Sequence, residues 1–208
     1  VPAGIPPKRA VLAANMETAL NVVWDGGIAP GDRVGIVGGG LVGLLAGWLA
    51  SRIAGVETCL VDPDETRRPV AEALGIGFSP PGEALTDCDV VLHLSGHGEG
   101  LATALPMAGF EARIVEASWY GEGEVPVALG GAFHSQRLSI VASQVGSVPP
   151  ARRARWTTRR RMETALSLLA DDRLDILISG ETPFGRLADA YGDILAASET
   201  LCHRIRYT

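Results

Sequence analysis

The sequence predicts a doubly wound α/β fold in which a six-stranded parallel sheet carries helices on both faces. Short runs rich in Val, Ile and Leu recur along the chain, and this composition is typical of strands buried on both faces of a parallel sheet. Helical segments separate these runs, as crossovers between parallel strands require. In the run 34–43, a strand passes through glycines into an apolar helix. An N-terminal helix and extra C-terminal helices and strands are expected beside the sheet.

The composition limits the kinds of partner that the chain can bind. Its 208 residues are 47% hydrophobic, and its net charge of −6 offers no general attraction to nucleic acid or to an anionic membrane. Cys59, Cys88 and Cys202 are far apart, so they predict neither a disulfide framework nor a zinc site. The chain has no apolar run long enough to cross a bilayer, and its start lacks a signal-peptide pattern. We therefore expect a cytoplasmic protein that binds neither nucleic acid nor membrane.

Residues 1–30 form the first unit of the chain. The segment begins proline-rich, and a helix is expected over residues 10–24 before Asp25, Gly26 and Gly27 end it. This helix precedes the sheet, whose unit is expected to span residues 31–150.

Three glycines in the run 34–43 have the spacing G-x-G-x-x-G, the dinucleotide-binding fingerprint of Rossmann folds. Gly38 permits a tight strand-to-helix turn, Gly40 lets the backbone approach a pyrophosphate, and Gly43 lets the helix pack closely on the strand. The N–H groups of Leu41 and Val42, at the helix N-terminus, would bind that pyrophosphate. The run therefore predicts a dinucleotide site.

An acidic residue follows at the distance that this fingerprint requires. Residues 58–61 are expected to form a buried strand, and Asp62 ends it about 20 residues after Gly43. A carboxylate there accepts hydrogen bonds from the adenosine ribose and repels a 2′-phosphate, which favours NAD over NADP. Arg67 and Arg68 follow closely and could bind such a phosphate. The alternative for Asp62 is a helix-capping or turn residue.

The remaining elements of residues 31–150 continue the alternation of strands and helices. Helices are expected at 65–74 and 100–108, and strands at 77–79, 89–95, 113–118 and 138–143. The cofactor crevice is predicted between the turn at Gly38 and the loops at Ser95 and Ser118, because the carboxyl ends of the strands meet there. His93 and His97 lie on a strand that runs into a glycine turn, so they do not share a helical face as a metal pair would.

Residues 151–208 extend beyond a minimal fold of this kind. Helices are expected at 158–170 and 184–197, and strand-like pieces at 174–179 and 203–207 have no evident place in the six-stranded sheet. A basic cluster lies at the start of this unit: Arg152, Arg153, Arg155, Arg159, Arg160 and Arg161. The cluster predicts a solvated helix face, with an anion site as the alternative.

With these residues in view, most of the chain resembles the cofactor-binding half of the medium-chain dehydrogenases, the family of zinc-type alcohol, threonine and polyol dehydrogenases. The segments similar to the sequence pattern of that family are Gly31-Asp32-Arg33-Val34, Val61-Asp62-Pro63-Asp64 with Arg67-Arg68, Ala73-Leu74-Gly75, Ser95-Gly96, Arg113-Ile114-Val115, Trp119-Tyr120-Gly121 and Ser143-Gln144-Val145-Gly146.

The resemblance implies hydride transfer between the nicotinamide of NAD and a small alcohol or carbonyl substrate, with NADP less favoured. It places Ser95 and Gly96 beside the adenosine or the bridging ribose. It also implies that Ala117 and Ser118 face the nicotinamide and that Ser143 belongs to a nearby loop.

Members of that family also carry an N-terminal GroES-like domain that holds the catalytic zinc, and this sequence contains none of it. We therefore expect a truncated or naturally shortened relative that is inactive alone, with zinc only in the absent domain, and we assign no catalytic residue and no metal ligand. Residues 1–30 would be the interdomain segment, and residues 151–208 would pack on the absent domain. The helix at 10–24 and the strands near Ile176 and Ile205 should then expose apolar surface, which predicts a homo-oligomer.

Two other classes of protein stay open at this point. A non-catalytic NAD-binding or interaction module would keep the same cofactor contacts. A methyltransferase that uses S-adenosylmethionine shares the glycine turn and the acidic residue, but its usual spacing G-x-G-x-G differs from the run ending at Gly43.

Overall fold

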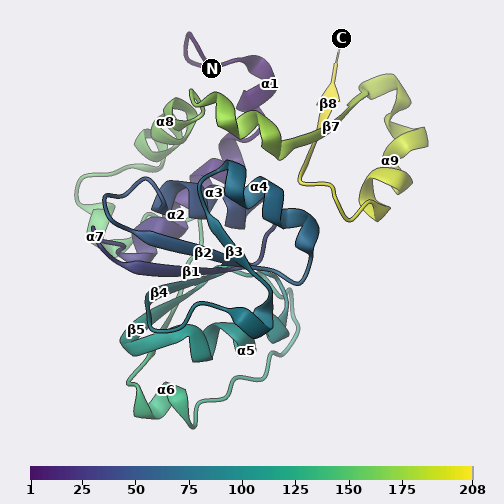
Figure 1. The fold of residues 1–208 in the computed structure, drawn as a ribbon. Helices are drawn as coiled ribbons and strands as arrows, with labels where there is room; N and C mark the ends of the chain where they lie inside the picture. The colour runs from purple at the N-terminus through teal and green to yellow at the C-terminus, as the bar shows by residue number, and fades with distance from the viewer. Residues whose placement is uncertain (208) are drawn as a thin grey trace.

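A computed structural model describes residues 1–207, and its centre is a sheet of six parallel strands (Figure 1). The strand order is β3-β2-β1-β4-β5-β6, so the winding direction reverses between β1 and β4. The strands are β1 Arg33–Val37, β2 Glu57–Val61, β3 Gly77–Ser79, β4 Cys88–His93, β5 Ala108–Glu116 and β6 Ser139–Ala142. The predicted doubly wound α/β fold is confirmed.

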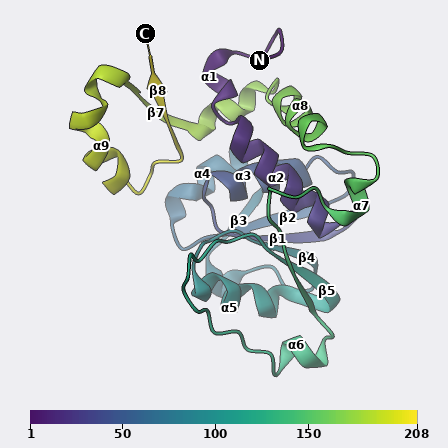
Figure 2. The same ribbon diagram turned by 180° about the vertical axis from the view of Figure 1, so that it is seen from behind.

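Helices cover both faces of this sheet. Figures 1 and 2 show α2 and α3 over one face, α8 outside α2, and α5 over the opposite face. The α-helices are α1 Pro7–Ala10, α2 Ala13–Gly26, α3 Leu41–Ala50, α4 Arg68–Ala73, α5 Gly98–Met107, α6 Ala132–Ser135, α7 Pro150–Arg153, α8 Thr158–Leu168 and α9 Leu187–Ala196. The short 3₁₀ helices are η1 Glu65–Arg67, η2 Pro81–Glu83, η3 Asp172–Leu177 and η4 Phe184–Arg186. None of the helices in residues 1–207 combines the length and apolar character needed to span a bilayer.

The strand side chains alternate between two apolar clusters. Ile36 and Leu92 belong to the cluster that includes α2 and α3, whereas Val37 and Val91 belong to the cluster that includes α5. Because both faces are covered, the central strands need apolar residues at nearly every position.

The expectation that the N-terminal helix exposes apolar surface is wrong. Met16 and Ala19 of α2 are fully buried, and Leu20 is nearly so. The helix lies between α3 and α8, which contact it on opposite sides, so elements of this chain cover its apolar face.

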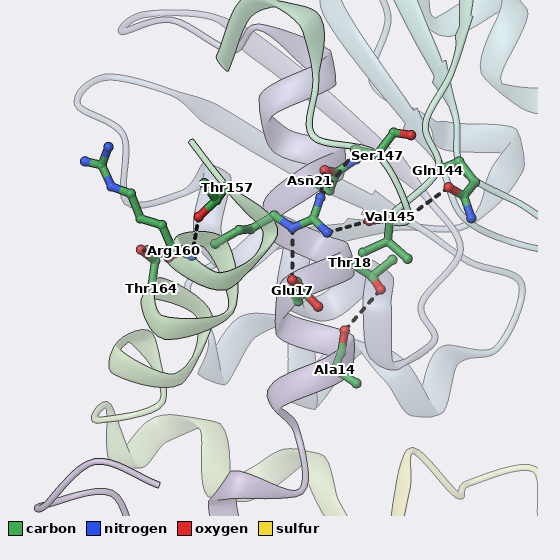
Figure 3. Close-up of polar contacts among 12 residues, drawn as sticks. Ala14, Glu17, Thr18, Asn21, Gln144, Val145, Ser147, Thr157, Arg160 and Thr164 are labelled. Atoms are coloured by element: carbon green, nitrogen blue, oxygen red, sulfur yellow. Dashed lines mark hydrogen bonds and ion pairs between the residues drawn. The ribbon is translucent and has the colours of Figure 1, made fainter. Parts of the chain in front are cut away.

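The expectation of a wholly solvated arginine face also needs correction, because the side chain of Arg161 is only 2% exposed. Its Nε donates to Glu17 Oε1 at 3.0 Å, and its Nη atoms donate to Asn21 Oδ1 and to the carbonyl oxygen of Val145. Figure 3 shows Glu17 and Asn21 of α2 close to Val145 at this point. Arg161 therefore ties α8 to α2 and to the loop after β6.

The C-terminal unit forms a separate sheet, in which β7 Ile178–Pro183 pairs in parallel with β8 Cys202–Arg206. It extends away from the central sheet together with α9 (Figure 1). The expected strand at 174–179 is wrong, because η3 occupies most of it. Asp171 caps this 3₁₀ helix by accepting the N–H of Arg173, and Leu174 and Leu177, three residues apart, are both fully buried.

The expected apolar exposure in this C-terminal unit is found at Ile176, which is 42% exposed, whereas Ile205 of β8 is half-buried. Three further apolar side chains are exposed, by 56% for Phe184, 56% for Tyr191 and 68% for Leu195.

Candidate functional site

At two of the three fingerprint positions in the turn between β1 and α3, the fold of the protein requires glycine even without a ligand. Gly38 has a φ of +111°, and a Cβ there would lie 2.7 Å from Cα of Ser95. A Cβ on Gly43 would lie 1.9 Å from the carbonyl oxygen of Gly38. A Cβ on Gly40, in contrast, would have no protein atom within 4 Å. The space at Gly40 is therefore open to a ligand.

The N-terminus of α3 presents backbone donors beside this open space. Gly40 is its N-cap and contributes no side-chain hydrogen bond. Among residues 1–207, no acceptor pairs with the N–H groups of Leu41 and Val42. These donors and the helix dipole suit an anion such as a pyrophosphate.

Asp62 lies at the carboxyl end of β2, directly beside the glycine turn. Its Oδ2 accepts the N–H of Gly39 at 2.6 Å and its Oδ1 accepts the N–H of Asp64 at 2.8 Å. These bonds hold the carboxylate at the rim of the turn.

The two arginines that follow Asp62 already have partners. Arg67 donates to the carbonyl oxygens of Ser198 and Glu199, the second at 3.3 Å. Arg68 donates to Glu65 Oε2 at 2.8 Å, and its guanidinium lies over the ring of Phe78, 4.5 Å from the centroid. Several of the N–H donors of each guanidinium are therefore already bonded to other groups of the protein.

A pocket of about 260 Å³ lies where the winding direction of the sheet reverses. Gly38, Asp62 and Ser95 line it, from the ends of β1, β2 and β4. The turn of α5 at Glu99 and Gly100 closes one side. Three of the predicted site residues are thus brought together at the place where nucleotides bind in doubly wound sheets.

The loops after β4 and β5 are linked to each other. The N–H of Gly96 donates to Ser118 Oγ at 3.0 Å, and the N–H of Ala117 donates to the carbonyl oxygen of His93 at 3.0 Å. Hydrogen bonds therefore join the two loops that carry Gly96, Ala117 and Ser118, the residues predicted at the edge of the crevice.

The side chain of Ser143 points instead into the protein. Its hydroxyl donates to Asp25 Oδ2 at 2.7 Å, and Asn21 Nδ2 donates to the same oxygen at 3.0 Å. Burial raises the pKa of Asp25, and the hydrogen bond from Ser143 opposes that rise.

A buried polar cluster under the pocket escaped the sequence analysis. His93 is fully buried and lies opposite Glu116 in the β4–β5 register. Its Nδ1 is 2.8 Å from Glu116 Oε2, and its Nε2 is 2.7 Å from Ser95 Oγ. Tyr120 Oη donates to the same carboxylate oxygen at 3.1 Å. The signal was present in the sequence as a histidine within an otherwise apolar strand.

The pKa values of this cluster reflect burial and hydrogen bonding. Burial opposes ionisation of Glu116, but the hydrogen bonds from His93, Ser118 and Tyr120 outweigh it, so its pKa is lowered. Burial, together with the negative charge of Glu116, raises the pKa of Tyr120 to about 12. Glu116 is therefore a carboxylate and Tyr120 a neutral phenol near neutral pH.

Within residues 1–207, no group of three or more His, Cys, Asp and Glu side chains is arranged to hold a metal ion.

Comparisons with known proteins identify the fold. No protein-family model and no curated protein sequence matches the chain. L-idonate 5-dehydrogenase from Escherichia coli K-12 matches with a TM-score of 0.83 and 20% identity, covering 99% of this chain and 59% of that protein. A protein described as a zinc-binding dehydrogenase, from Sinorhizobium meliloti and bound to NADP, matches with a TM-score of 0.78 and 21% identity, covering 96% and 60%. A protein described as a short chain alcohol dehydrogenase, from E. coli CFT073 and complexed with NADH, matches with a TM-score of 0.78 and 18% identity, covering 99% and 60%.

Structural neighbours of the chain are zinc-type medium-chain alcohol and polyol dehydrogenases. The chain has the Rossmann-like fold of their cofactor-binding half and spans about 60% of their length.

Proposed function

We propose that this chain is the cofactor-binding portion of an NAD-dependent oxidoreductase of the medium-chain alcohol dehydrogenase type. The observation that carries the proposal is the pocket in which Asp62 and the glycine turn meet at the switch point of the sheet. The open space at Gly40 supports it, because a dinucleotide needs that approach to the backbone. The nicotinamide supplies the hydride chemistry, exchanged with a small alcohol or carbonyl substrate.

In this proposal each residue of the site binds or orients part of the dinucleotide. The turn and the N-terminus of α3 bind the pyrophosphate, Asp62 binds the adenosine ribose, and Arg67 borders that ribose. The loops after β4, β5 and β6 would lie along the rest of the cofactor. The set is Gly38, Gly40, Leu41, Val42, Gly43, Asp62, Arg67, Ser95, Gly96, Ala117 and Ser118. The side chain of Ser143 stays outside it, because its hydroxyl donates to Asp25.

We further propose that the site prefers NAD over NADP. The carboxylate of Asp62 would repel a 2′-phosphate, and both nearby guanidinium groups are held by other partners. The solved neighbours include one complex with NADP and one with NADH, so the preference depends on these particular residues.

The test is a titration with NADH and with NADPH that follows nicotinamide fluorescence. Wild-type protein should bind NADH more tightly than NADPH, and Asp62→Asn should narrow that difference because it removes the charge with little change of shape. Asp189→Asn, on exposed α9, is the matched control and should leave both affinities unchanged. A wild-type protein that binds neither nucleotide would contradict the proposal.

A second candidate is a non-catalytic NAD-binding or interaction module that self-associates. The exposed Phe184, Tyr191 and Leu195 favour it, because they offer apolar surface to a partner. Assays with NAD and a panel of alcohols, in the presence of a zinc-holding catalytic domain of that family, separate the two candidates, since only the oxidoreductase then produces NADH.

A further inference from the structure

His93 lies between Glu116, whose carboxylate can only accept hydrogen bonds, and the hydroxyl of Ser95, which can donate or accept. Glu116 Oε1 accepts the N–H of Ser118 at 2.8 Å, and Oε2 accepts from His93 Nδ1 and from Tyr120 Oη. A carboxylate can only accept, so the proton of a neutral His93 ring belongs on Nδ1. Nε2 then carries a lone pair, which points at Ser95 Oγ, 2.7 Å away.

This arrangement fixes the direction of the Ser95 hydroxyl. Two acceptors lie within reach of its proton, His93 Nε2 at 2.7 Å and the carbonyl oxygen of His97 at 3.1 Å. The proton belongs on the shorter contact, because the Nε2 lone pair and Oγ would otherwise face each other with no proton between them. The N–H of His97 donates to Oγ at 3.1 Å. One acceptor site of Ser95 Oγ is left over, and Ser95 lines the pocket together with Asp62. Ser95 therefore faces a ligand as an acceptor only.

The first turn of α5 lies close over the two side chains. A Cβ on Gly100, in the first turn of α5, would lie 2.2 Å from Ser95 Oγ and 2.6 Å from His93 Nε2. Glycine at this position is what lets the helix close over the pair.

We propose that His93, oriented by Glu116, is a positioning residue that makes Ser95 an acceptor for a ribose hydroxyl of the bound dinucleotide. The inference rests on the proposed function. A ribose hydroxyl can donate to such an acceptor, whereas a phosphate oxygen at the same place would meet a second acceptor without a proton between them. In this arrangement Ser95 binds the ribose, and the glycine turn binds the pyrophosphate.

A double-mutant cycle on NADH affinity tests this role. Ser95→Ala should weaken binding about fivefold, the loss of one ordinary hydrogen bond. His93→Asn keeps a donor for Glu116 but no longer reaches Ser95, so it should give a similar loss. Because His93 acts through Ser95, the double variant should bind no more weakly than Ser95→Ala alone. His134→Asn, an exposed histidine of α6, is the control and should bind like wild type.

The ¹⁵N spectrum of the imidazole gives a second readout that needs no ligand. Wild-type His93 should show the Nδ1–H tautomer, and the isosteric Glu116→Gln should shift the ring toward the Nε2–H tautomer. Should His93→Asn fail to fold, Glu116→Gln takes its place in the cycle. An Nε2–H tautomer in wild type, or additive losses in the cycle, overturns the inference alone. Absence of NADH binding by folded wild-type protein overturns the proposed function instead.

Discussion

The carbonyl oxygen of Gly38 lies 1.9 Å from the position that a Cβ on Gly43 would occupy. The first turn of α3 is thus seated directly on the end of β1, and no side chain fits between them. Gly40, between these two glycines, has no such neighbour. The fingerprint therefore contains glycines required by the fold and one left open to a ligand.

Alanine substitutions should separate these two requirements. Gly40→Ala should leave the unfolding midpoint unchanged and weaken NADH binding about tenfold, or about 1.4 kcal/mol, because the methyl group enters the space of the pyrophosphate. Gly43→Ala should lower the unfolding midpoint as well, because the turn must shift. Thermal unfolding and NADH titration of both variants measure the effects, with Gly192→Ala on α9 as control. Equal destabilisation by the two substitutions would contradict this division.

Removal of the Arg161 guanidinium should destabilise the protein strongly. Arg161→Ala leaves Glu17 and Asn21 without their partner in a buried place, which typically costs about 3–5 kcal/mol. Arg161→Lys should recover part of that loss, because it restores the charge but not the fork of donors. The free energy of unfolding in urea measures both. Arg159→Ala, whose side chain is 87% exposed, should cost less than about 1 kcal/mol, and an equal effect of both alanine variants would refute the argument.

Stability should depend on Asp175 in a pH-dependent way. The hydrogen bond from Arg9, 2.7 Å long, and the contact with Lys8 lower the pKa of Asp175 to about 2. A carboxyl whose pKa is lowered in the folded state stabilises the fold above its unfolded pKa of about 4 and loses that effect as the pH falls through 2. Wild type should therefore exceed Asp175→Asn in unfolding free energy at pH 6, and the gap should close near pH 2. The gap between wild type and Asp193→Asn, on exposed α9, should stay small throughout.

The apolar surface of the C-terminal unit should drive self-association. The rings of Phe184 and Tyr207 stack at 4.9 Å between centroids while both stay exposed, and Leu195 of α9 is 68% exposed. Leu195→Glu should shift the sedimentation profile toward the monomer. Leu129→Glu, at a leucine that is 57% exposed in the loop after β5, should have no effect. A wild-type protein that sediments as a monomer at all concentrations would rule out this expectation.

The sheet could be predicted from the sequence because its signals are local. Alternation of buried faces makes each central strand a continuous apolar run, and the glycines of the turn follow within a few residues. The pocket could be anticipated for the same reason, since parallel strands bring their carboxyl ends to one edge.

The polar clusters could not be predicted, because their partners are distant in the sequence. His93 meets Glu116 only through the register of β4 and β5, and Arg161 meets Glu17 across 144 positions. Ser143 was expected near the nicotinamide from resemblance, yet its hydroxyl is bonded to Asp25. Helix η3 was mistaken for a strand because Leu174 and Leu177 also fit an apolar run, and only the cap at Asp171 distinguishes the two.

The bonds from Arg67 to the carbonyl oxygens of Ser198 and Glu199 connect the edge of the nucleotide pocket to the segment between α9 and β8. A ligand that takes over the hydrogen bonds of the Arg67 Nη atoms must release that segment. The free energy of ligand binding and the free energy of segment release are therefore linked. Such linkage is reciprocal. An interaction that holds the segment in place lowers the affinity for the ligand by the same factor by which the ligand weakens the docking of the segment. A nucleotide with a 2′-phosphate would meet this penalty, and one without it would leave the distal end of the chain undisturbed.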